Sequence, residues 1–105
     1  MRKTTQKDLA TSQDDFRELS RTLAELRDPA GVETFLRELC TPAECVGLAM
    51  RWRLVKELLS GKSQRTVARE LGMSLCRITR GARYVRTPGS ILAGRARESL
   101  NKEST

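Results

Sequence analysis

The sequence predicts an all-α protein, and three observations lead to that fold class. Apolar residues recur at steps of three and four, and no stretch shows the alternation typical of a strand. Serine, threonine, aspartate and proline stand where helices begin, and the joints between the helical stretches are only a few residues long. A chain of 105 residues then has room for one domain of about six helices.

The first half of the chain predicts two of these helices. Residues 1–10 are polar and without periodicity, so we expect a flexible arm there. Ser12 and Asp15 resemble a capping box that opens the first helix. Its narrow apolar seam, which is suited to packing against a partner helix, consists of Phe16, Leu19, Leu23 and Leu26. Asp28 and Pro29 then open a second, shorter helix.

Thr41-Pro42-Ala43-Glu44 is a stronger start signal, with a capping threonine, a proline at the first position and a glutamate that closes the box. The third helix should run to about Leu59 and end at Ser60-Gly61. We expect its apolar face to include Leu48, Trp52, Val55 and Leu59.

The stretch from Ser63 to Arg80 has the spacing of a helix-turn-helix, with an ordinary helical hairpin as the alternative. Ser63 and Ser74 are placed to cap its two helices, and Gly72 supplies the positive φ of a tight turn. Ala68 is small where the second helix should cross. The expected small core consists of Val67, Leu71, Leu75 and Ile78.

The charge is concentrated in the same half of the chain. Residues 1–50 hold 7 basic and 9 acidic side chains, whereas residues 51–105 hold 13 basic and 4 acidic ones. Seven of these basic residues and one acidic residue lie between Lys62 and Arg86. A basic face on such a motif predicts binding to double-stranded DNA.

In a helix-turn-helix the start of the second helix reaches the base edges, and the first helix holds phosphates. The residues expected to face the bases are Ser74, Leu75, Cys76 and Arg77, and Thr79 on the same helix is also expected to bind DNA. Arg77 has the bidentate donor fork suited to guanine. The expected contacts to the DNA backbone are Lys62, Gln64, Arg65 and Arg69.

Other function classes find little support. The chain has no histidine, and Cys40, Cys45 and Cys76 show no CxxC spacing, which argues against a zinc site and against an enzyme. No apolar run approaches the roughly 18 residues of a membrane span. We therefore expect a cytoplasmic protein with reduced thiols, no metal and no membrane partner.

The size of the chain favours a homodimer. With one Trp, one Tyr and two Phe, a monomer of this length has little apolar surface to bury. We expect a dimerisation core over residues 11–60, a DNA-binding region over 61–86 and a C-terminal helix and tail over 87–105.

Several of these segments resemble the tryptophan repressor family over roughly residues 32–86. The resemblance is carried by Thr41-Pro42-Ala43-Glu44, Arg51, Lys56-Glu57-Leu58-Leu59-Ser60-Gly61, Ser63-Gln64-Arg65 and Ile78-Thr79-Arg80-Gly81. It implies a six-helix intertwined homodimer that binds L-tryptophan as corepressor. The family is also the established example of base contacts made largely through water.

By resemblance, Arg51 and Arg80 would hold the indole between them, Gly81 would leave room for the ring, and Thr41 would lie beside carbonyls that accept from the ligand ammonium. Tyr84 stands where the family has a small hydroxyl residue, so it also belongs to the predicted ligand site. Glu38 replaces a familiar leucine, and the joint at residues 61–63 is one residue shorter than in the best-known members.

Together these features predict a bacterial transcription repressor that responds to tryptophan and controls genes of tryptophan biosynthesis or transport. A repressor that does not use tryptophan is the first alternative, favoured by the bulk of Tyr84. A helical protein that binds an acidic protein partner is the second.

Overall fold

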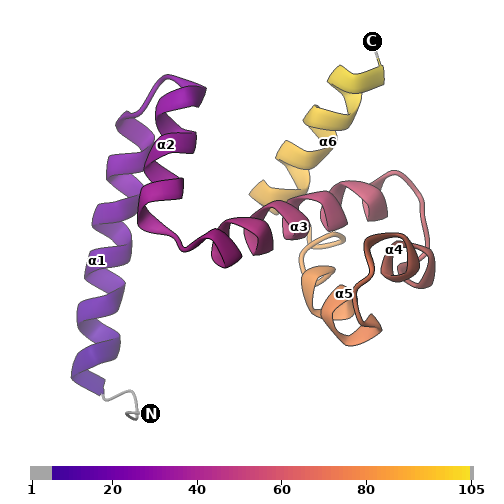
Figure 1. Ribbon diagram of the computed structural model, residues 1–105, viewed down its shortest axis with the longest axis horizontal. Coiled ribbons are helices and arrows are strands. Elements are labelled where there is room, and N and C mark those ends of the chain that lie inside the picture. Colours follow the sequence, from indigo (N-terminus) through magenta and orange to yellow (C-terminus); the bar gives the residue numbers. More distant parts are fainter. Residues whose placement is uncertain (1–5, 105) are drawn as a thin grey trace. The chain divides into compact units, whose positions relative to one another are not determined.

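The computed structural model describes residues 6–104, with side chains described for residues 11–103, and it contains six α-helices and no strand in that range (Figure 1). The all-α class and the number of helices are therefore as predicted. The helices are α1 (Gln6–Glu25), α2 (Pro29–Leu39), α3 (Pro42–Leu59), α4 (Gln64–Leu71), α5 (Leu75–Gly81) and α6 (Ile91–Ser104).

The chain divides into two compact units, residues 1–41 and residues 42–105. The first unit contains α1 and α2, and Asp28 caps α2 as predicted, because its carboxylate accepts a hydrogen bond from the Ala30 N–H at 3.3 Å. None of the residues from 11 to 41 is fully buried, and Phe16 is 69% exposed. The described side chains of this unit, residues 11–41, therefore form no closed core.

Helix α1 begins at Gln6, so the predicted start at Ser12 is wrong. Residues 6–11 contain neither proline nor glycine, and nothing in them prevents the helix from extending past the expected cap. Of the predicted arm, residues 1–5 lie outside the described part of the chain.

The core of the second unit lies where α4, α5 and α6 pack against the C-terminal half of α3 (Figure 1). Leu54 and Val55 of α3 are almost completely buried, and each of the other three helices contributes to the same cluster. The remaining buried members are Val67 of α4, Ile78 of α5 and Ala96 of α6. This cluster fixes α5 relative to α3, which is the relationship that shapes the candidate site.

Helix α6 packs closely against α3 because it presents small residues there. Ala93 and Ala96 are buried, and both allow the backbones to approach. Near the end of α6, the carboxylate of Glu103 forms an ion pair with the ammonium of Lys56, whose side chain is only 10% exposed. The positive charge of Lys56, which lies in the interface between α3 and α6, is thus balanced by a carboxylate of α6.

Two expectations about apolar residues are wrong. Leu75 was expected in the small core but is 45% exposed, because it lies at the first position of α5, before the turn that carries Ile78 into the core. Met73, in the preceding turn, packs against the core instead. On α3, Leu48 and Trp52 are 47% and 37% exposed. The helix has apolar residues around its circumference, and spacing alone did not single out Leu54.

Candidate functional site

Helices α4 and α5 are joined by a short turn whose local chemistry follows from three residues. Ser63 accepts a hydrogen bond from the Thr66 N–H at 3.1 Å, and Ser74 accepts one from the Arg77 N–H at 3.2 Å. Gly72 adopts φ 64°, which favours glycine. Both predicted caps and the predicted left-handed turn residue are confirmed.

A side-chain hydrogen bond also connects the two helices. The Thr79 hydroxyl on α5 donates to the Gln64 amide oxygen at the start of α4, at 3.0 Å. The two residues are both exposed, so this bond lies on the surface of the pair. It holds the first turn of α4 against the middle of α5.

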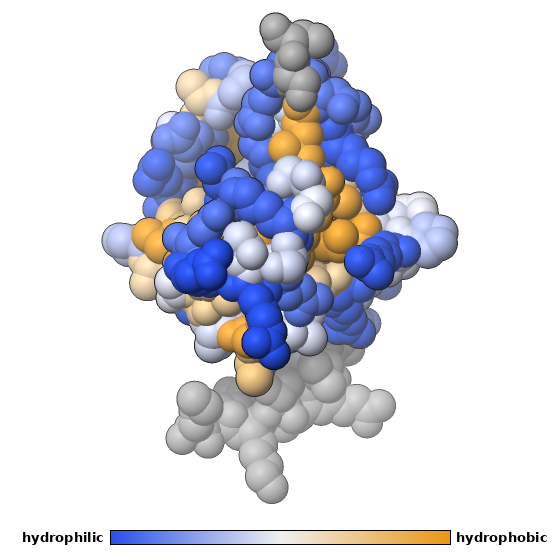
Figure 2. Space-filling view, turned by 90° about the vertical axis from the view of Figure 1, so that its right-hand side faces the viewer, coloured by the Kyte–Doolittle hydropathy of each residue, from blue (hydrophilic) through white to orange (hydrophobic). Residues whose placement is uncertain are grey.

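All the residues predicted to contact DNA are exposed. The exposed arginines Arg65, Arg69 and Arg77 form no ion pair with any residue from 11 to 103. Figure 2 views the molecule from the side on which α4 lies in Figure 1, and that face is mostly hydrophilic, with hydrophobic residues confined to a few groups. The exposed predicted residues are Lys62, Gln64, Arg65, Arg69, Ser74, Leu75, Cys76, Arg77 and Thr79.

Lys62 differs from the others because two carboxylates already hold it. Its ammonium pairs with Glu57 of α3 and with Glu70 of α4, the latter at 2.7 Å. The hydrogen bonds to Glu57 and Glu70 raise the pKa of Lys62, and the hydrogen bond from Lys62 lowers the pKa of Glu57. This lysine therefore links α3 to α4 across the turn between them. The turn also contains Gly61, whose φ is 105°.

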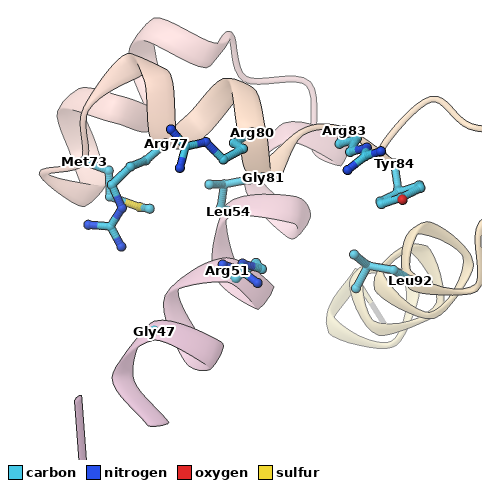
Figure 3. Close-up of a pocket in the computed structure, with 10 residues that line it drawn as sticks. All are labelled: Gly47, Arg51, Leu54, Met73, Arg77, Arg80, Gly81, Arg83, Tyr84 and Leu92. Atoms are coloured by element: carbon cyan, nitrogen blue, oxygen red, sulfur yellow. The ribbon is translucent and has the colours of Figure 1, made fainter. Parts of the chain in front are cut away.

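A cavity of about 430 Å³ lies against α3 and α5, and four of the five residues predicted for ligand binding line it (Figure 3). These are Arg51 from α3, Arg80 and Gly81 from the end of α5, and Tyr84 from the segment that follows. The sequence places Arg51 and Arg80 far apart, and the fold brings them to one opening. The fifth predicted residue, Thr41, is the last residue of the first unit and is exposed.

Sequence reasoning did not assign the rest of the lining to this site. Arg83 follows Arg80 by about one helical turn, so the spacing of basic residues was a usable signal for it. Leu92 comes from α6 and has no such signal, because only tertiary packing brings it there. The lining residues beyond the predicted four are Gly47, Leu54, Met73, Arg77, Arg83 and Leu92.

The cavity is strongly basic. Four arginines line it, and no aspartate or glutamate does. Met73 and Arg77 lie on one side of the opening, and Tyr84 and Leu92 lie on the other (Figure 3). The Tyr84 ring is 47% exposed, and the guanidinium carbon of Arg83 lies 5.3 Å from its centroid, a cation–π contact. Tyr84 therefore lies at the rim of the cavity.

Gly81 has a packing role in addition to its place in the lining. A Cβ on residue 81 would lie 2.9 Å from Cδ1 of Leu54 and 3.0 Å from its Cδ2. Leu54, which is almost completely buried, would therefore have to shift to make room for that atom. The glycine is what lets the end of α5 approach α3.

Comparison with known proteins supports one family. The family described as Trp repressor protein matches residues 14–92, a range that includes the C-terminal part of α1, helices α2 to α5, the cavity-lining residues and the first two residues of α6. The chain belongs to the Trp repressor family. No solved structure matches the chain.

The Trp repressor family is a family of DNA-binding regulators and not of enzymes. In general, this family binds tryptophan as corepressor. None of the helices in the described part of the chain is long and apolar enough to cross a membrane.

Proposed function

We propose that this protein is a sequence-specific transcription repressor that acts in the cytoplasm as a homodimer and takes L-tryptophan as corepressor. The observation that carries the proposal is the position of Arg80. Its side chain lines the cavity with Arg51, and it also borders the exposed groove of α5 with Leu75, Cys76 and Thr79. A ligand in the cavity would touch a residue of the surface proposed to read DNA.

In this proposal α4 and α5 form a helix-turn-helix. Helix α5 enters the major groove, and α4 and the turn lie on the phosphates. Support comes from the two serine caps, the left-handed Gly72 and the exposed arginines Arg65, Arg69 and Arg77. Two such units in a dimer would reach half-sites about one helical turn apart, roughly 34 Å.

The proposed dimer uses surfaces that the single chain leaves open. None of the residues from 11 to 41 is fully buried, and Val46 and Leu48 on the N-terminal half of α3 are 62% and 47% exposed. A second copy would cover apolar side chains that a monomer leaves in water. Residues 11–60 are therefore proposed as the dimerisation core and 61–86 as the DNA-binding region, with 87–105 as a C-terminal helix and tail.

For the ligand, we place the indole between the guanidinium groups of Arg51 and Arg80, where their planes stack on its faces, and the carboxylate at the Arg80 fork. Thr41 and the neighbouring backbone carbonyls would accept from the ammonium. Filling this space would hold α5 in one position against α3, a position that the free protein occupies only part of the time. The regulated genes would be those of tryptophan biosynthesis or transport.

A tryptophan-independent repressor is the second candidate, and one observation favours it. The cavity lining holds four arginines and no carboxylate to receive an ammonium group, so it suits an anion at least as well as a zwitterion.

Calorimetric titration with L-tryptophan, followed by duplex binding with and without it, distinguishes the two candidates. Tryptophan should bind and tighten specific DNA binding, and operator DNA should raise tryptophan affinity by the same factor. Arg80→Ala should abolish this coupling. Equal operator binding with and without millimolar tryptophan would leave the tryptophan-independent repressor.

A further inference from the structure

The exposed side of α5 carries a shallow groove of mainly apolar character. It is lined by Leu75, Cys76, Thr79 and Arg80. Leu75 is 45% exposed, and Cys76 and Thr79 are exposed as well. This exposed apolar patch lies beside exposed arginines such as Arg77 and Arg80. An exposed apolar patch bordered by polar residues often marks a binding site.

The hydroxyl groups beside this groove are already engaged. Ser74 accepts from the Arg77 N–H at 3.2 Å, so its oxygen serves as the cap of α5. The Thr79 hydroxyl gives its only proton to Gln64 at 3.0 Å, so it has none to donate to a base. The groove therefore presents mainly carbon and sulfur atoms to whatever binds there.

The charges on α5 and on the adjoining helix α4 select among possible occupants of the groove. Arg65, Arg69, Arg77 and Arg80 are exposed and form no ion pair within residues 11–103. A second copy of the chain placed on this groove would bring the same arginines against each other. A polyanion with an apolar group at its centre fits both the groove and its surroundings.

Double-stranded DNA is a polyanion that presents one kind of apolar group in its major groove. On the major-groove edges of the four base pairs, the C5 methyl of thymine is the apolar feature. We propose that α5 determines sequence specificity through direct contact of Leu75 and Cys76, together with the methyl group of Thr79, with thymine methyl groups. This inference rests on the proposed DNA-binding function and adds to it the base that is recognised.

The test begins with selection of duplexes from a random pool by the full chain, with and without L-tryptophan. Each thymine of the selected half-site is then replaced singly by uracil, which keeps every hydrogen-bonding group and removes the methyl. We expect one or two positions in each half-site at which uracil weakens binding about fourfold, the effect of losing one buried methyl group.

Variants assign the effect to the groove. Leu75→Ala and Cys76→Ser should each bring the ratio of thymine to uracil affinity to about one at one of these positions. Both side chains are exposed, so folding should persist and circular dichroism checks it. Arg65→Gln is the matched control, because it should weaken all duplexes alike and leave the ratio unchanged.

The possible outcomes distinguish a failure of methyl recognition from a failure of the proposed DNA-binding function. If a specific duplex is selected but no uracil substitution changes its affinity, methyl recognition is overturned and the repressor function stands. The same holds if Leu75→Ala and Cys76→Ser retain the full wild-type ratio. If no duplex is enriched over random DNA in either condition, the proposed DNA-reading function fails, and this inference fails with it.

Discussion

Lys56 of α3 and Glu103 of α6 form an ion pair between side chains that are 10% and 58% exposed. Replacing Glu103 by Gln leaves the ammonium among apolar residues with a weaker partner. We expect the free energy of unfolding to fall by about 1 kcal/mol, a modest loss because water reaches the glutamate side of the pair. Urea unfolding followed by Trp52 fluorescence measures it. Lys56→Met, which removes the buried charge itself, should cost less than Glu103→Gln, and the reverse order would contradict this account.

Gly81→Ala tests the close approach of α5 to α3. The added methyl group would meet Leu54 at 2.9 Å, so we expect a loss of about 1–3 kcal/mol in the free energy of unfolding. Gly94→Ala on α6 is the control, because a Cβ there meets nothing within 4 Å. In the double variant with Leu54→Val, the cost of Gly81→Ala should shrink. Additive losses in the double-mutant cycle would show that Leu54 is not the obstacle.

The pH dependence of stability should have two limbs set by one cluster. Glu57 has a pKa below 4.5 in the folded state, so its contribution is present above that value and is lost as the pH falls through the lowered pKa. Lys62 has a pKa above 10.5, so its contribution is present below 10.5 and is lost as the pH rises through the raised pKa. Between these limits the cluster adds no slope.

Glu57→Gln should accordingly flatten the acid limb, as measured by urea midpoints between pH 5 and the acid transition. Asp15→Asn, an exposed carboxylate in the first unit, is the control. An unchanged acid limb in Glu57→Gln would contradict the assignment to this cluster.

The rim position of Tyr84 leads to a prediction about ligand binding. If the ring only borders the cavity, Tyr84→Ser should change tryptophan affinity by a small factor. If instead the ring takes the indole's place in solution, Tyr84→Ser should create tryptophan binding that the wild type lacks. Calorimetry on both proteins distinguishes these results, and Arg51→Ala, introduced into whichever of the two proteins binds tryptophan, should remove that binding.

The open apolar surface of the first unit predicts that stability depends on protein concentration. The melting temperature should rise with concentration, and Phe16→Ser should lower it, because Phe16 is 69% exposed in the single chain. A folded monomer at high dilution in sedimentation experiments would contradict the proposed dimer.

The residues that sequence analysis placed well are those governed by local chemistry. Asp28, Ser63 and Ser74 cap the helices expected of them, because a cap depends on neighbours within a few residues. Leu48, Trp52 and Leu75 were wrongly expected to be buried, because burial depends on where neighbouring helices cross. The sequence pattern also gave no indication that Arg77 and Leu92 line the cavity. Those positions depend on how α5, α6 and the segment between them pack against α3.

The double ion pair at Lys62 bears on how salt should affect DNA binding. Glu57 and Glu70 already neutralise the ammonium of Lys62. This ammonium can therefore neutralise a DNA phosphate only if one of the two ion pairs opens. Counting every basic residue from 62 to 86 as a phosphate contact would therefore overstate the number of counterions released from DNA. A plot of log affinity against log salt concentration should be shallower than that count implies, by about 0.9 for this one lysine.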